Sequence, residues 1–108
     1  MTFIKINETL YPATISGKMA DRDWDNRESK AITLEMDYGT AINLFVDGLA
    51  WSIVEQNENG TEIQETEWDN SYFTLAGDLT DHRDGTITVK MGKLTELEEA
   101  YEIMLGGI

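Results

Sequence analysis

Short segments in which apolar and polar residues alternate, separated by turn signals, recur along most of this chain. The segment Lys30–Met36 is the clearest, because its apolar residues fall on one face at the two-residue period of a strand. Asn59-Gly60 is the strongest hairpin signal, since both residue types tolerate the positive φ angles of a type I′ turn. The pattern predicts an α+β fold, mainly an antiparallel β-sheet of about six to seven strands with two helices.

The predicted strands can be placed by residue. The segment Thr61–Glu67, which follows the Asn-Gly turn, is acidic and poor in apolar residues, so it is expected at a sheet edge. Pro12 is expected at an edge or at the start of a strand, because it cannot donate to a ladder. The strands are expected at Thr2–Ile6, Leu10–Met19, Lys30–Met36, Leu49–Gln56, Thr61–Glu67, Tyr72–Leu79 and Thr86–Met91.

Two helices are predicted by caps and by apolar spacing. Asp37 is the expected N-cap of the first helix, and Gly48 its stop. In the second helix, Thr95 and Glu98 fit a capping box, and Gly106-Gly107 follows the last turn. The face expected to be buried in that helix consists of Leu97, Ala100, Tyr101 and Met104, with Ile103 beside it and Glu96, Glu99 and Glu102 toward water.

Two pairs of segments resemble each other and suggest an internal duplication. Thr14–Asp21 matches Thr74–Asp81, and Ile32–Met36 matches Ile87–Met91. The match predicts two pseudo-symmetric β-rich halves, 3–48 and 49–107, each ending in a helix and sharing one core in a single domain, 1–108. Chance likeness between β-rich segments is the alternative. If the duplication is real, bulges or sharp bends are expected at the matched glycines, Gly17 and Gly77.

Charge and composition restrict the classes of function. The net charge is −13, so the overall field repels nucleic acid and anionic lipid and attracts basic protein surfaces. The acidity also serves solubility. The chain has no cysteine, which excludes disulfides and thiolate metal sites. No apolar run has membrane length and no signal peptide begins the chain, so a cytoplasmic protein without membrane or direct nucleic-acid contact is expected.

The residues that could support catalysis are few. His82 is the only histidine, and neither a nucleophile elbow nor a phosphate-binding glycine loop occurs. The run Asp21-x-Asp23-x-Asp25 begins like a calcium loop, but Asn26 stands at the turn glycine and Ile32 at the bidentate acid. We therefore expect a protein that is not an enzyme and holds neither a metal nor a cofactor.

Candidate contact residues fall into three groups. Trp24 and Trp68 each precede Asp-Asn, and each is either a core anchor or an exposed hot spot for a protein partner. Acids on the predicted hairpin could meet a basic protein surface; they are Glu55, Glu58, Glu62, Glu65, Glu67 and Asp69. Basic residues around the two acidic loops could contact an anionic ligand; they are Lys18, Arg22, Arg27 and Arg83.

Three segments, Trp24–Met36, Leu44–Trp51 and Ala76–Lys93, resemble small uncharacterised proteins encoded by phages and prophages of Gram-positive gut bacteria. The resemblance spans most of the chain and implies a viral protein, placed in the cytoplasm of the bacterial host or in the virion. The first expectation is a tail-associated structural or assembly protein that forms homo-oligomers. The alternatives are an anti-defence inhibitor that binds a basic surface, anti-CRISPR-like or a DNA mimic, and a sponge for a nucleotide signal.

Overall fold

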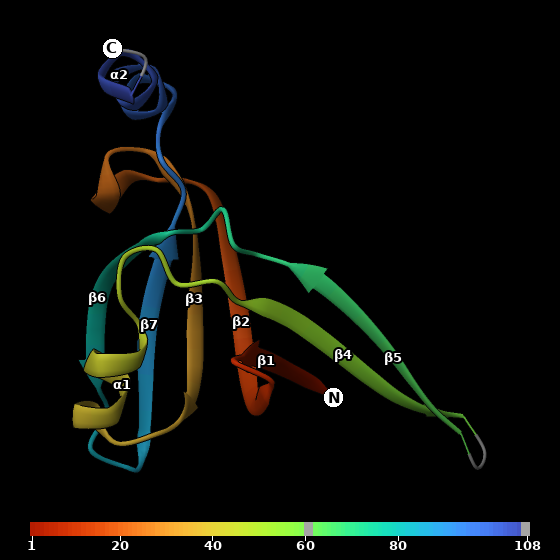
Figure 1. Cartoon of the computed structure of the whole chain (residues 1–108). Coiled ribbons are helices and arrows are strands. Elements are labelled where there is room, and N and C mark those ends of the chain that lie inside the picture. The colour runs from red at the N-terminus through yellow and green to blue at the C-terminus, as the bar shows by residue number, and fades with distance from the viewer. Residues whose placement is uncertain (60–61, 107–108) are drawn as a thin grey trace.

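The chain folds around one antiparallel sheet, and the computed structural model describes residues 1–59 and 62–106 (Figure 1). Across these residues the seven strands have the order β5-β4-β1-β2-β3-β7-β6, and two α-helices follow β3 and β7. The predicted α+β fold is therefore confirmed. In chain order the elements are β1 (Thr2–Ile6), β2 (Thr9–Asp21), the 3-10 turn η1 (Arg22–Trp24), β3 (Arg27–Glu35), α1 (Tyr38–Leu44), β4 (Ser52–Asn59), β5 (Glu62–Asp69), β6 (Leu75–Asp81), β7 (Thr86–Gly92) and α2 (Glu96–Gly106).

The long strand β2 joins two parts of the sheet. Its first residues, Thr9 to Pro12, pair with β1, and the residues from Ala13 onward pair with β3. Pro12 therefore lies inside a central strand and not at a strand start, so that prediction was wrong. By the alternation of the antiparallel ladders its backbone points toward β3, whose last residue, Glu35, lies opposite it. The missing N–H of Pro12 therefore removes one hydrogen bond, at the very end of the β2–β3 ladder.

Two hairpins, β2–β3 and β6–β7, meet where β3 pairs with β7. Thr33 lies opposite Thr88 at that seam, and their Oγ1 atoms are 2.8 Å apart. The matched segments of the two halves cross at this pair, as a pseudo-twofold axis would require. In the neighbouring strands, however, Thr33 pairs with Thr14 and Thr88 with Thr80, whereas the sequence match equates Thr14 with Thr74. The duplication stays a prediction.

The core lies on one face of the sheet and is closed by α1 and by the segment between β5 and β6. Asp37 caps α1 as predicted, accepting from the Thr40 N–H at 2.9 Å, and the helix buries Ala41 and Phe45. Trp51 donates its Nε1–H to the Phe73 carbonyl at 3.2 Å. The strands supply the other side chains of this hydrophobic core cluster, namely Ile4 and Ile6 from β1, Ile32 and Leu34 from β3, and Ile87, Val89 and Met91 from β7.

Several strand boundaries differ from the predicted ones. β2 runs to Asp21 and β3 starts at Arg27, so the loop between them is shorter than the polar segment predicted for it. β6 begins at Leu75 rather than at Tyr72, because Phe73 leaves the sheet to fill the core. The acidic strand β5 is at an edge, as predicted.

The indole of Trp24 rests on bare backbone at Gly77 and Gly92. A Cβ built on Gly77 would be 2.7 Å from Trp24 Cη2, and one on Gly92 would be 2.7 Å from Trp24 Cζ3. The β6–β7 register shifts between Ala76 and Leu79, so the bulge predicted at Gly77 is present. Gly17 pairs in register with Lys30, and the shift in β2 comes after Lys18, so the bulge predicted at Gly17 was wrong.

A side chain added where Trp24 rests on the backbone should destabilise the fold. In the Gly92→Ala variant the new methyl would lie 2.7 Å from Trp24 and 2.8 Å from Arg27 Cδ, both in packed positions. We expect the free energy of unfolding to fall by about 1–3 kcal/mol, the usual cost of overpacking. Urea denaturation measures it. Gly17→Ala is the matched control, since its nearest neighbour is the Ser29 carbonyl at 4.0 Å, and equal losses in both variants would contradict the proposed contact.

Candidate protein-binding site

The C-terminal helix α2 stands clear of the sheet and shows its apolar face to solvent. Figure 1 places it beyond the end of β7, at the opposite end of the sheet from the β4–β5 hairpin. Leu97 is 81% exposed, Tyr101 63% and Met104 70%. These side chains share one helix face by their spacing, and Leu105, which is 58% exposed, extends that face. The result is a contiguous apolar surface, which we call the α2 apolar face (Leu97, Ala100, Tyr101, Met104 and Leu105).

This exposure corrects the prediction that the same stripe is buried. The helical spacing of apolar residues shows that a face needs a cover, but it does not show which molecule supplies the cover. Here the chain leaves the sheet after Gly92, and the first helical residue is Glu96. The α2 acids Glu96, Glu99 and Glu102 are exposed, as predicted.

The N-terminus of α2 has the predicted capping box. The Thr95 N–H donates to Glu98 Oε1 at 2.8 Å, and the Glu98 N–H donates to Thr95 Oγ1 at 3.2 Å. An isolated helix of 11 residues is marginal in water, so these bonds matter for keeping α2 folded while its apolar face is bare.

One buried cation, Arg27, fastens α2 to the sheet. Its guanidinium donates to Glu98 Oε1 at 2.6 Å and to Oε2 at 3.2 Å, a two-pronged ion pair, and to the Lys93 carbonyl at 2.9 Å. The other face of Arg27 lies 5.0 Å from the ring centroid of Trp24. The Arg27 hydrogen bonds hold the pKa of Glu98 down at about 2. No local sequence pattern indicates this ion pair, because its two members are 71 residues apart in the chain.

The hairpin acids are divided between the two faces of the β4–β5 arm. The register places Glu65, Glu67 and Asp69 on one face and Glu55 on the other. Glu55 accepts from the amino group of Met1, and Lys5 donates to Glu67 at 3.3 Å. Asp69 accepts from Ser71. These predicted contact residues thus do not form one acidic face. The side chains of Glu58 and Glu62 lie outside the described residues.

The two tryptophans of the Trp-Asp-Asn motifs occupy different environments. Trp24 is half-buried against Gly77 and Gly92, so it is an anchor within the fold. Trp68 lies on edge strand β5 and is 52% exposed, so it stays available to a partner. The identical neighbours of the two residues did not distinguish these environments. The buried aromatic side chains are instead Phe45, Trp51 and Phe73.

The four basic residues proposed for an anionic ligand do not come together. Arg27 is buried and bound to Glu98, whereas Lys18, Arg22 and Arg83 are exposed. Arg83 lies in the β6–β7 turn, and the register of β3 with β7 puts that turn at the opposite end of the sheet from η1. No shared pocket for an anion follows from these positions.

The acidic run at 21–25 is used within the fold. Asp21 is buried and accepts from Ser29 Oγ and from Lys90 Nζ, each at 3.0 Å. The hydrogen bond from Lys90 lowers the pKa of Asp21, which also accepts from the Asp23 N–H. Among residues 1–59 and 62–106 no cluster of three or more His, Cys, Asp or Glu side chains is arranged to hold a metal ion.

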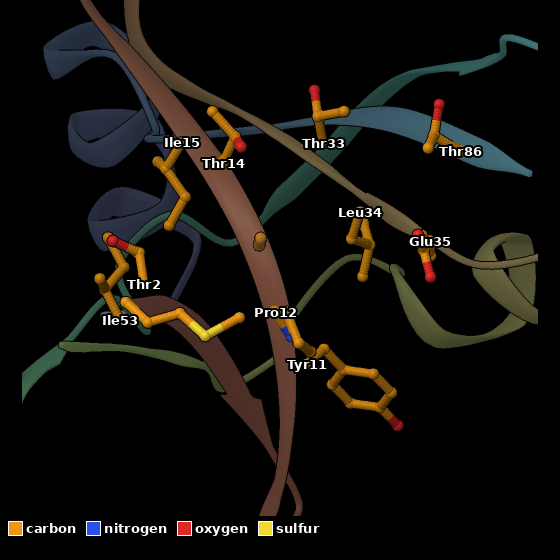
Figure 2. Close-up of a pocket in the computed structure, with 12 residues that line it drawn as sticks. Thr2, Tyr11, Pro12, Thr14, Ile15, Thr33, Leu34, Glu35, Ile53 and Thr86 are labelled. Carbon is orange, nitrogen blue, oxygen red and sulfur yellow. The ribbon is translucent and has the colours of Figure 1, made fainter. Parts of the chain in front are cut away.

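A shallow hollow of about 930 Å³ lies where β2 changes neighbours. Figure 2 shows Thr2, Ile15 and Ile53 on one side of β2, with Thr33, Leu34 and Glu35 on the other. Its lining combines apolar side chains with threonine hydroxyls and contains one exposed carboxylate, that of Glu35.

Breaking the Arg27–Glu98 pair should loosen α2 from the sheet. In Glu98→Gln the amide side chain can still cap the helix, so the change removes mainly the ionic bond to Arg27. We expect faster amide hydrogen exchange throughout α2 than in Glu99→Gln, which alters an exposed glutamate of the same helix. Unchanged exchange in α2 would show that the pair does not hold the helix.

The same anchor should respond to acid with a defined sign. The folded-state pKa of Glu98 is lowered from 4.5 to about 2, so the contribution of Glu98 is complete above pH 4.5 and is lost as the pH falls through about 2. Exchange of the α2 amides, corrected for intrinsic rates, should therefore approach that of Glu98→Gln only in this acidic range. If the native chain and Glu98→Gln already exchanged their α2 amides at equal rates above pH 4.5, the lowered pKa of Glu98 would be contradicted.

Comparison with family models, with curated proteins and with solved structures gives no match for this chain. Within residues 1–59 and 62–106, neither helix combines the length and the apolar character needed to cross a membrane. The candidate site therefore depends on its own geometry, which is a capped acidic helix, anchored at its first turn and bare along one apolar face.

Proposed function

We propose that this chain is a non-enzymatic protein-binding module that inserts α2 into a groove on a protein partner, as an assembly or tail-associated component of a phage particle. The single observation that carries the proposal is the α2 apolar face, in which Leu97, Tyr101 and Met104 are each more than three-fifths exposed. Contiguous apolar surface of this kind marks interaction sites on soluble domains. The phage setting comes from the resemblance of sequence.

The geometry of α2 favours binding as a preformed helix. The Thr95–Glu98 capping box and the Arg27 ion pair both act on the first turn, which leaves the remaining turns free to enter a groove. Covering one Leu or Met side chain completely contributes about 1.5–3 kcal/mol. These contacts already hold α2 in its helical conformation, so binding loses less conformational entropy. More of the free energy gained by burying the apolar side chains then appears as affinity.

The charges of α2 indicate the chemistry of its partner. Glu96 and Glu102 stand on either side of the apolar face, Glu99 lies on the opposite side of the helix, and the helix contains no basic residue. Two copies of α2 placed face to face would bring glutamates together without any cation. A groove with an apolar floor and a rim of Lys or Arg would instead pair with them, and it would discriminate against acidic surfaces.

A second candidate, an inhibitor of a host defence protein, shares this contact chemistry. It is favoured by the exposed row of Glu96, Glu99 and Glu102 on a helix held away from the body of the molecule. The division of the hairpin acids between two faces gives a DNA-mimic surface less support. The two candidates differ in the identity of the partner: a particle subunit for the first and a host effector for the second.

The proposal predicts that the apolar face, and not the acidity alone, determines capture of the partner. Tagged protein is produced in host cells that are making phage particles, and proteins that copurify are quantified by mass spectrometry. The double variant Leu97→Gln, Tyr101→Gln keeps helix propensity and charge, since both side chains are exposed in the free protein. Removing two apolar side chains that the partner would cover should weaken capture at least about tenfold.

Glu99→Gln is the matched control, because it lies on the acidic side of the same helix. It should keep most of the capture at high salt, where rim charges are screened. A particle subunit that is lost only in the double variant supports the assembly role, and a host effector supports the second candidate. Identical captured proteins in all three forms would sink both.

A further inference from the structure

Strand β2 has an open edge inside the sheet. β1 pairs with β2 only as far as Pro12, and β3 pairs with it from Ala13 onward on the other side. Among the described residues, Thr14 to Lys18 therefore have a neighbouring strand on one side alone. Their exposure fits this position, since Thr14, Ser16, Gly17 and Lys18 are all exposed and Met19, just beyond them, is 82% exposed.

The backbone groups that face this open edge follow from the alternation of the ladders. Met1 and Gln56 exchange backbone bonds, at 2.7 Å from the Met1 amino group and 2.9 Å from the Gln56 N–H. Residues that exchange bonds alternate along an antiparallel pair, so Ile4 faces β2 and its partner Tyr11 faces β1. Counting along β2 in steps of two, Ile15 and Gly17 point to the β1 side, where no strand lies beside them.

The hydrogen bonds between β3 and β7 give the same orientation for the residues of β2. The Lys93 N–H donates to the Glu28 carbonyl at 2.9 Å, so Glu28 faces β7 and Ala31 faces β2. Ser16, the partner of Ala31, then faces β3. Gly17, the next residue, faces away from β3. Ile15 and Gly17 thus each direct an N–H and a carbonyl into the open edge, beside the hollow lined by Thr2 and Ile53.

The outer edges of the sheet are protected, whereas this one is not. β5 carries Glu65, Glu67 and Asp69, and β6 carries Asp78 with a register shift beside it. Charges and bulges of this kind prevent pairing between sheet edges. In a chain of net charge −13, β2 has no acid from Thr9 to Ala20, and Lys18 is its single charge there. An antiparallel contact between two β2 edges would therefore bring no acid opposite another acid.

We propose that two copies of this chain associate through the β2 edge, as antiparallel strands with Gly17 opposite Gly17 of the second copy. This register lets each Gly17 exchange two backbone bonds with its counterpart. It places Ser16 beside Lys18 of the other copy, and it brings exposed Met19 next to Ile15. The contact is separate from α2, so the dimer displays two α2 apolar faces for partners of the kind proposed above.

A single cysteine tests this register, because the chain contains none of its own. Residues that exchange bonds across an antiparallel pair have Cα atoms about 5.5 Å apart, within the range of a disulfide. Gly17→Cys has room for its side chain, since the nearest atom to its Cβ is 4.0 Å away. Mild oxidation should convert most of it to a covalent dimer. Thr66→Cys, exposed on edge strand β5, is the control and should remain mostly monomeric.

Sedimentation velocity without a cross-link gives the second test. The native chain should form dimers reversibly between about 1 µM and about 1 mM, as contacts of small area do. Added salt should strengthen association by screening the net charge of each copy. Gly17→Glu places like charges opposite each other and should weaken dimers at least about tenfold, whereas Thr66→Glu adds the same charge on β5 and should not.

Two results would overturn the proposal. One is a native chain that stays monomeric at high salt at every protein concentration between about 1 µM and about 1 mM. The other is a dimer that resists Gly17→Glu, or for which Gly17→Cys and Thr66→Cys cross-link equally. If that dimer is instead abolished by Leu97→Gln with Tyr101→Gln, self-association belongs to α2, and the role proposed for its apolar face changes with it.

Discussion

The continuity of β2 across Pro12 is the constraint on which the rest of the structure depends. One strand of 13 residues takes part in two ladders, first with β1 and then with β3. Because neither ladder covers its whole length, the sheet is stepped, and the hollow and the open edge are both consequences of that step. The proline stands at the handover, where its missing N–H faces Glu35, the last residue of β3, so only the end of the β2–β3 ladder loses a hydrogen bond.

Arg27 plays a comparable role at the far end of the sheet. A buried guanidinium needs several acceptors, and it obtains them from α2 through Glu98, from the linker through the Lys93 carbonyl, and from Asp25 in the preceding loop. Trp24 covers its remaining face and in turn depends on Gly77 and Gly92. Removing one partner would leave a charge in a poorly solvated place, so these elements are coupled although they are distant in sequence.

Local patterns were sufficient for the parts of the fold that local physics determines. Alternation placed β3, and the pairing of Asp37 with Thr40 and of Thr95 with Glu98 placed both helix starts. Patterns could not show what covers a face. Ala41 of α1 is buried, whereas the regular apolar stripe of α2 is exposed, because only tertiary geometry brings the sheet to one helix and not to the other.

The candidate site was predicted only in part for the same reason. Its acids could be read from the helix, but its anchor is a contact between Arg27 and a residue far along the chain. Acidity in this molecule has at least two separate uses: it guards the outer strands, and it flanks an apolar helix face. Those uses explain why charge counted over the whole chain indicated binding without locating it. The two proposed binding surfaces are placed where acid is absent along β2, and where it stands beside the uncovered side chains of Leu97 and Tyr101.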